Sequence, residues 1–280
     1  KNLVKVFFLD LKIKLVRTAK HMTGSSNICL GGGCAYNGVA NALAYKYFDS
    51  VHVPFAPSDA GSAIGACLDN HSHISPYLGT SYTDKRVSKL LSPYKESITI
   101  FKLSEDKLIK KVAALIHSQN IIAWFQGNME FGARALGNRS ILASPVLPNM
   151  REKLNKVIKK REGFRPFAPS VPLDNADRFF DLKEPSPYMN KVVKGKTKLI
   201  PSATHINGTC RVQTVTALQN PKYFKLLKEV GRLTQIPVLL NTSFNLKDQT
   251  ITISPKQAIE RYLSSDIDFL VINNYLIRKK

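Results

Sequence analysis

The organisation of this chain follows from one segment, Trp124-Phe-Gln-Gly-Asn-Met-Glu-Phe-Gly-Ala-Arg-Ala-Leu-Gly-Asn-Arg-Ser140. The apolar run over 121–125 gives way abruptly to three glycines, a carboxylate and two arginines. This composition is typical of a buried strand that ends in a ligand-binding loop. The segment therefore predicts a strand followed by a loop that binds an anion.

A second segment, Lys159-Lys-Arg-Glu-Gly-Phe-Arg-Pro-Phe-Ala-Pro-Ser170, has the same character. Most of the positive charge of the chain is lysine, but these two segments contain two arginines each. The arginines are Arg134 and Arg139 in the first segment and Arg161 and Arg165 in the second. Guanidinium groups match carboxylate and phosphate oxygens two at a time, which favours an anion site. The alternative is a solvated basic loop held by surface ion pairs, which contribute little to stability.

The length of 280 residues and the hydrophobic fraction of 44% allow a substantial core, and we expect two domains. No apolar run approaches the roughly 20 residues of a membrane helix. Lys5 and Asp10 interrupt the apolar N-terminal stretch, so we interpret it as part of the fold and not as a secretory signal. Because the chain begins at Lys1 and not at a methionine, we expect a fragment or a trimmed sequence.

The cysteines at positions 29, 34, 67 and 210 form no CxxC pair and no disulfide framework. We therefore expect reduced thiols and a cytoplasmic protein. The pair His71-Ser-His73 is a zinc candidate but is more typical of a polar loop.

The formal net charge of +21 raises the question of nucleic acid as a partner. The lysines are scattered, and we find no interleaved aromatics or nucleic-acid motif beside them. A lysine-rich or phosphate-binding protein has the same excess of positive charge, so we do not expect a nucleic-acid partner.

Residues 1–73 are predicted to form a first unit, in which strand 27–30 runs into a glycine loop and a helix over 39–45. Such a loop brings backbone N–H groups close to a phosphate, but it is equally typical of tight packing between helix and strand. Asp59 starts a small-residue helix, where an aspartate is usually a cap. Residues 74–98 lack periodicity and are predicted to connect two domains.

Residues 99–280 are predicted to alternate helices and strands, which indicates an α/β fold with a mixed sheet. The expected helices lie after Ser104 and over 150–160, 221–234 and 255–263. The expected strands cover 121–125, 237–240 and 268–272, the last closing the fold, with a hairpin over 205–215. Polar residues 241–245 follow a buried strand, as in a ligand rim or in a simple turn.

Six motifs in order resemble the O-carbamoyltransferases of the NodU/CmcH type, over nearly the whole chain. They are Gly32-Gly33 with Asn37, Pro57-Ser-Asp59-Ala-Gly61, the segment 132–140, the segment 161–170, Arg211-Val-Gln-Thr-Val215 and Asn241-Thr-Ser-Phe-Asn245. The resemblance implies the end of an actin-like (ribonuclease H-like) carbamoyl-transfer domain, followed by a YrdC-like α/β domain with a twisted mixed sheet. It also implies that the half of the first domain with two metal-binding histidines is absent.

The implied activity is ATP-dependent O-carbamoyl transfer. Carbamoyl phosphate and ATP form carbamoyl-adenylate, and the carbamoyl group passes to a hydroxyl-bearing small molecule. Alternatives are an enzyme similar to tRNA threonylcarbamoyl-adenylate synthase, and an inactive remnant or RNA-binding protein.

The resemblance also implies site residues. Lys159 and Arg161 match a Lys-x-Arg pair, and Ser243 and Asn245 match a Ser-x-Asn pair, which hold ATP phosphates and the carbamoyl donor. The same cationic cavity is expected to include Arg134, Arg139, Arg165 and Arg211, with Glu130 orienting an arginine or a magnesium ion. Such a cavity stabilises the departing pyrophosphate.

In the first unit, Gly32, Gly33 and Asn37 are implied to flank the adenylate. Asp59 matches a metal-ligating aspartate for iron or another divalent metal, which a lone carboxylate binds poorly without the histidines of the absent half. The sequence departs from the family pattern at Asn128, where an arginine is usual, and at Ala133 and Gly163. The missing charge at Asn128 is expected to weaken phosphate binding.

Overall fold

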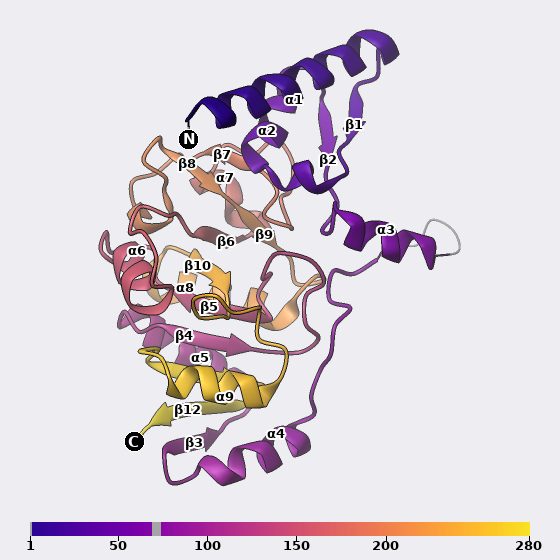
Figure 1. Cartoon of the computed structure of the whole chain (residues 1–280). Helices are drawn as coiled ribbons and strands as arrows, with labels where there is room; N and C mark the ends of the chain where they lie inside the picture. Colours follow the sequence, from indigo (N-terminus) through magenta and orange to yellow (C-terminus); the bar gives the residue numbers. More distant parts are fainter. Residues whose placement is uncertain (1, 69–73) are drawn as a thin grey trace.

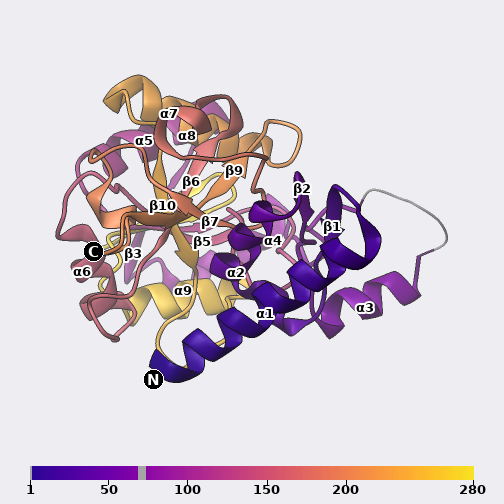
Figure 2. The same cartoon turned by 90° about the horizontal axis from the view of Figure 1, so that it is seen from above.

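A computed structural model describes residues 2–68 and 74–280, which form a first unit and a larger sheet domain (Figure 1). The first unit is built from α1 (Asn2–Thr23), β1 (Asn27–Cys29), α2 (Gly38–Leu43), β2 (Ser50–His52) and α3 (Asp59–Ala66). Strands β1 and β2 pair in parallel, and Val16 of α1 packs with Phe48 and Val51 in a small core. Helix α3 has no buried residue and projects away from the rest of the molecule (Figure 2).

The sheet domain contains one eight-stranded sheet in the order β3-β12-β11-β4-β5-β10-β6-β9. Its strands, in chain order, are β3 (Ile98–Lys102), β4 (Ile122–Phe125), β5 (Arg139–Ala143), β6 (Ala168–Pro172), β9 (Gln213–Val215), β10 (Leu239–Ser243), β11 (Phe269–Ile272) and β12 (Tyr275–Lys279). Only the pairs β11–β4 and β6–β9 are parallel, and the other neighbours are antiparallel. The predicted α/β fold with a mixed sheet is therefore confirmed, and most of its pairing is antiparallel.

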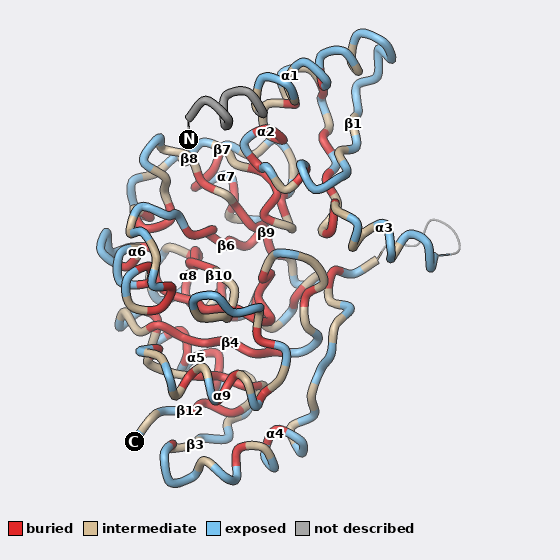
Figure 3. The backbone as a smooth tube through the Cα atoms, viewed as in Figure 1, coloured by how far each residue is buried: buried red, intermediate tan, exposed pale blue. Residues whose placement is uncertain are grey.

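Helices cover both faces of this sheet, and the buried residues lie between the layers (Figure 3). One face carries α5 (Glu105–His117) and α8 (Pro221–Thr234), whose apolar residues pack on Trp124. The opposite face packs against α4 (Asp84–Leu91), α6 (Met150–Lys153) and α9 (Pro255–Leu263). A short helix, α7 (Ala176–Phe179), and the hairpin strands β7 (Val192–Lys194) and β8 (Thr209–Arg211) complete the domain.

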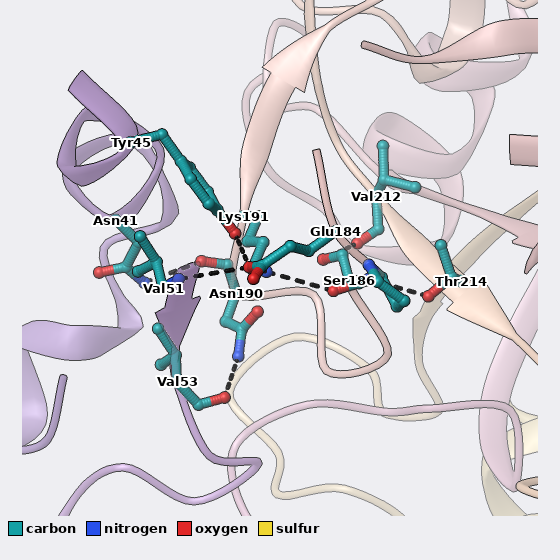
Figure 4. A network of polar contacts seen from close by, with 11 residues as sticks. Asn41, Tyr45, Val51, Val53, Glu184, Ser186, Asn190, Lys191, Val212 and Thr214 are labelled. Atoms are coloured by element: carbon teal, nitrogen blue, oxygen red, sulfur yellow. Dashed lines mark hydrogen bonds and ion pairs between the residues drawn. The ribbon is translucent and has the colours of Figure 1, made fainter. Parts of the chain in front are cut away.

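A polar network joins the first unit to the sheet domain (Figure 4). The carboxylate of Glu184 accepts hydrogen bonds from the hydroxyl of Tyr45 and, at 3.0 Å, from the ammonium of Lys191. Burial raises the pKa of Glu184, but hydrogen bonds from Ser50, Tyr45, Lys191 and the backbone of Val51 together lower it to about 2. The Asn41 side chain donates to the backbone oxygen of Asn190 at 2.8 Å. Because Asn41 and Asn190 are buried, this contact is part of a packed interface.

The structure corrects several predicted elements. Residues 84–91 of the expected connection form helix α4, because Thr83 caps it and Val87 and Leu91 are buried in the core. The predicted helix over 150–160 is α-helical only to Lys153 and continues as a π-helical turn to Ile158. The last strand of the chain is β12, and not β11, and it lies inside the sheet between β11 and β3. Strand β8 pairs with β7, so the predicted hairpin has its first strand well before residue 205.

Two sequence-based expectations concern metal and membrane. The pair His71-Ser-His73 lies outside the described residues. Across residues 2–68 and 74–280, we find no helix of the length and apolarity that a bilayer crossing requires.

Candidate active site

Lys159 meets Ser243 and Asn245, which lie 84 and 86 positions further along the chain, in one hydrogen-bonded cluster. The Lys159 ammonium donates to the backbone oxygen of Ser243 at 2.6 Å, and to the backbone and side-chain oxygens of Asn245 at 3.0 and 2.8 Å. The Ser243 hydroxyl donates to the same side-chain oxygen of Asn245 at 2.6 Å. The predicted Lys-x-Arg and Ser-x-Asn pairs therefore lie together.

The position of Lys159 follows from its local backbone. The π-helical turn Leu154–Ile158 ends directly before it, and Lys160 adopts the left-handed conformation with φ +44°. This reversal allows both Lys159 and Arg161 to line the same cavity. Lys159 is only 7% exposed, and burial, followed by the charges of Arg161 and Arg261, lowers its pKa to about 7.

Asn155, which the sequence did not single out, organises the second arginine segment. Its side-chain amide donates to the backbone oxygens of Gly163 and Arg165, at 3.1 and 2.8 Å. Its side-chain oxygen accepts from the Nε of Arg161 at 2.7 Å. The guanidinium of Arg161 also lies 5.0 Å from the ring centre of Phe167. One fully buried asparagine therefore fixes the loop and one of its arginines.

Two adjoining cavities open on these groups. The larger, of about 580 Å³, is lined by the Lys159 cluster together with Arg161 and Arg165. The smaller, of about 270 Å³, is lined by Arg134, Arg161, Arg165 and Arg211. Arg161, Arg165, Thr242 and Ser243 belong to the walls of both. Arg165 is half exposed and pairs with Glu162 at 2.9 Å.

The smaller cavity concentrates positive charge. Burial, followed by the charges of Arg134 and Arg161, lowers the pKa of Arg211 to about 10. The Nε of Arg211 is buried without a hydrogen-bond partner among the described residues. No carboxylate is present among the residues that line this cavity. A desolvated cation whose charged neighbours are other cations is costly, so the surroundings of Arg211 fit a site that is completed by an anion.

Arg139 and Glu130 do not line either cavity, so the expectation that they complete it is not supported. The fully buried Arg139 guanidinium lies 3.6 Å from the ring centre of Phe125 and donates to the backbone oxygens of four residues. These oxygens belong to residues 80, 126, 127 and 138. One oxygen of Glu130 accepts from the backbone N–H groups of Leu136, Asn138 and Arg139. Both side chains therefore hold the loop in shape, and the buried Glu130 does not fit a magnesium ligand.

Asn128 also lies outside both cavities. Its side chain donates to the backbone oxygen of Tyr77 at 3.4 Å. The backbone of Met129 exchanges hydrogen bonds with Gly79 and Thr80, which binds the arginine loop to the connection before α4. The expectation that Asn128 removes a phosphate contact is therefore not supported by its position.

The residues of the first unit that were expected to bind the adenylate or a metal lie apart from the arginines of the two cavities. The exception is Asn37. Asn37 caps α2 through the N–H of Ala40 at 3.2 Å and lines a cavity of about 200 Å³ that also contacts Arg211. Gly32 and Gly33 start a short 3-10 turn and line none of the cavities described above. Asp59 starts the exposed helix α3, and the described residues contain no cluster of three His, Cys, Asp or Glu side chains that could hold a metal. These residues do not fit an iron site by themselves.

Comparison with known proteins agrees with this arrangement. Residues 3–68 match the family profile described as carbamoyltransferase N-terminus, and residues 113–279 match the profile described as carbamoyltransferase C-terminus. The chain belongs to the carbamoyltransferase family. The resemblance inferred from the six motifs is thereby confirmed.

Two relatives illustrate the family. The chain is 36% identical to nodulation protein NolO of Bradyrhizobium diazoefficiens, over 95% of the chain and 52% of that protein. It is 37% identical to nodulation protein U of Rhizobium fredii, over 82% of the chain and 40% of that protein. The chain therefore spans about half of the length of these relatives. A crystal structure of full-length HypF in the phosphate- and nucleotide-bound form is a distant likeness, with a TM-score of 0.42 and 19% identity over 64% of this chain and 22% of that one.

Proposed function

We propose that the two adjoining cavities of this carbamoyltransferase form carbamoyl-adenylate from carbamoyl phosphate and ATP. Water first releases inorganic phosphate from carbamoyl phosphate and leaves carbamate. A carbamate oxygen then attacks the α-phosphorus of ATP, the bond to the bridging oxygen breaks, and pyrophosphate leaves. The carbamoyl group finally passes to the hydroxyl of a small-molecule acceptor, whose oxygen displaces AMP.

The observation that carries this proposal is the group of Arg134, Arg161 and Arg211 with no lining carboxylate. The reaction collects the charges of a triphosphate and a carbamate in one place. Preorganised cations stabilise both the approach of the anions and the departing pyrophosphate. The Lys159 cluster adds hydrogen-bonding groups in the adjoining cavity, which we propose takes the remaining phosphates.

The finer domain assignment belongs to the same proposal. We propose that residues 99–280 are the YrdC-like, adenylate-forming domain and that residues 1–73 belong to an actin-like transfer domain. The family membership of both parts supports this assignment. ATP is proposed to bind as its magnesium complex, and no step is assigned to a second metal because Asp59 belongs to no cluster of three possible ligands within residues 2–68 and 74–280.

The direct test supplies the chain with ATP, magnesium and carbamoyl phosphate and measures AMP and pyrophosphate. We expect pyrophosphate release that requires carbamoyl phosphate and is lost in Lys159→Ala and Ser243→Ala. Lys156→Ala is the matched control, because Lys156 lies in the same segment but is exposed and pairs with Glu152. Wild-type protein that forms no AMP under these conditions contradicts the proposal. Product formation from threonine and bicarbonate in place of carbamoyl phosphate would identify a threonylcarbamoyl-adenylate synthase instead.

A further inference from the structure

A single buried side chain, Gln213, joins three segments that carry the arginines and the serine of the proposed site. Its amide nitrogen donates to the backbone oxygen of Leu136 at 2.9 Å. Its side-chain oxygen accepts from the hydroxyl of Ser170 at 2.6 Å and from the amide of Asn241 at 2.9 Å. Gln213 is 2% exposed, and each of its three partners lies on a different segment of the chain.

A residue that lines one of the cavities lies two positions along the chain from Leu136, from Asn241 and from Gln213 itself. Leu136 follows Arg134 in the arginine loop, and Asn241 precedes Ser243 on β10. Gln213 itself follows Arg211 by two positions. On strand β10 this separation leaves little freedom between Asn241 and Ser243, because the backbone there is extended. Arg134 and Leu136 lie in the arginine loop, and Arg211 and Gln213 lie in the successive strands β8 and β9. The hydrogen bonds of Gln213 therefore tie together the segments that carry Arg134, Arg211 and Ser243.

The chemistry of the partners fixes the orientation of this amide. A backbone oxygen can only accept, so the edge of Gln213 that faces Leu136 must be the N–H₂ group. The opposite edge is then the oxygen, and Ser170 and Asn241 must donate to it. Because Gln213, Ser170 and Asn241 are buried, rotation of the amide would break all three hydrogen bonds and leave buried polar groups unpaired.

We propose that Gln213 is the positioning residue that preorganises the anion cavity. The inference rests on the proposed function, because it assumes that Arg134 and Arg211 bind anionic groups of the substrates. Gln213 does not line the two cavities and acts only through the segments that it joins. The Leu136 oxygen also accepts from the Tyr77 hydroxyl at 3.0 Å, so one hydrogen bond still holds the arginine loop when the amide is removed.

The test compares Gln213→Met with Gln126→Met. Gln126 is also a buried glutamine, 4% exposed, whose amide donates to one backbone oxygen, that of Asn273. Both variants remove a buried amide, so both lose stability in urea unfolding. Only Gln213→Met is expected to bind inorganic pyrophosphate more weakly, with a rise in Kd of about tenfold by calorimetry.

A second variant covers the case in which Gln213→Met does not fold. Ser170→Ala removes one of the two donors to the Gln213 oxygen and is expected to give a smaller rise in Kd. The double variant Gln213→Met/Ser170→Ala is expected to bind no more weakly than Gln213→Met, because Ser170 acts through the amide.

The outcomes separate the two proposals. If wild-type protein does not bind pyrophosphate, the anion cavity itself is wrong and the role of Gln213 falls with it. If wild-type protein binds but Gln213→Met and Ser170→Ala bind equally well, only the positioning role is wrong. If Gln126→Met also bound pyrophosphate as weakly as Gln213→Met, the positioning role would be overturned. The rise in Kd would then follow from lost stability alone.

Discussion

The guanidinium of Arg134 lies against the aromatic ring of Tyr36, with 5.6 Å between the guanidinium carbon and the ring centre. Its Nη2 also donates to the backbone oxygen of Tyr36 at 3.5 Å. Tyr36 belongs to the first unit, whereas Arg134 belongs to the arginine loop of the sheet domain. The first unit thus supports one wall of the smaller cavity, although its own predicted binding glycines lie elsewhere.

Removal of this ring is expected to weaken anion binding. Tyr36→Ala frees the Arg134 side chain, and a partly exposed cation–π contact is worth about 1 kcal/mol, or about fivefold in Kd. Tyr36→Phe keeps both the ring and the backbone oxygen and is expected to bind pyrophosphate like wild type. Calorimetry on the three proteins checks this, and equal affinities for Tyr36→Ala and Tyr36→Phe would show that the ring does not hold the arginine.

Arg139 and Arg134 are expected to separate stability from binding. Arg139→Met leaves four backbone oxygens without their donor and should lower the free energy of unfolding by about 3–5 kcal/mol. Arg134→Met should change it by less than about 1 kcal/mol but should abolish most pyrophosphate binding. Urea unfolding and calorimetry on both variants measure the two effects. A stable Arg139→Met protein that has lost binding would place Arg139 in the cavity after all.

The buried charge of Arg211 is expected to lower the free energy of unfolding of the wild-type protein. Since burial and two neighbouring cations lower its pKa to about 10, Arg211→Met should raise the free energy of unfolding by about 1 kcal/mol in a buffer without phosphate. Added pyrophosphate stabilises only a protein that binds it, so it should raise the melting temperature of wild type more than that of the variant. Thermal unfolding with and without pyrophosphate tests this, and a less stable variant in both conditions contradicts it.

The sequence predicted the elements that carry their own start signals. Helix α8 begins after the cap Asn220, and α9 begins after Ser254, whose hydroxyl accepts from the N–H of Gln257. Strand β6 escaped prediction because it contains Pro169 and Pro172, which normally argue against an inner strand. Strand β5 escaped because it starts with a charged side chain, Arg139, that is buried only through its contacts in the folded protein.

The grouping of the site residues came from the family resemblance, because residue type alone left residues 241–245 as either a ligand rim or a turn. The resemblance implied that Lys159, Ser243 and Asn245 share one cavity, and the structure brings these three side chains together. The direction of a loop side chain is a different matter, because an arginine can bind either a ligand or nearby backbone oxygens. Arg139 binds backbone oxygens, because the folded loop brings those of Gln126 and Gly127 within reach of its guanidinium.

Asn128 offers a direct check of that distinction. If its position were part of the phosphate site, Asn128→Arg would restore a missing contact and tighten ATP binding. Because its amide binds the Tyr77 oxygen and it lines neither cavity, we expect unchanged affinity. A Kd for ATP that falls more than a few-fold in Asn128→Arg would return this residue to the site.

Lys159 is expected to make stability depend on pH. Its pKa is about 7 in the folded protein and near the ordinary 10.5 in the unfolded chain. Between these values the unfolded chain binds more protons, so the free energy of unfolding rises with pH. Relative to Lys159→Met, wild type should gain about 1.4 kcal/mol for each pH unit in this window. Parallel urea curves at pH 7, 8 and 9 measure the difference, and a difference that does not change with pH contradicts the lowered pKa.

The same shift is expected to couple ATP binding to a proton. An anion in the larger cavity favours the ammonium form of Lys159 and raises its pKa, so at pH 8.5 the binding of ATP should draw a proton from the buffer. Calorimetry in two buffers of different ionisation enthalpy reports that proton directly. Lys159→Met should take up fewer protons from the buffer than wild type. Lys156→Met, which changes an exposed lysine of the same segment, should take up as many as wild type. Equal proton uptake in all three proteins would mean that Lys159 is already charged before ATP arrives, and that its hydrogen bonds to Ser243 and Asn245 outweigh its burial.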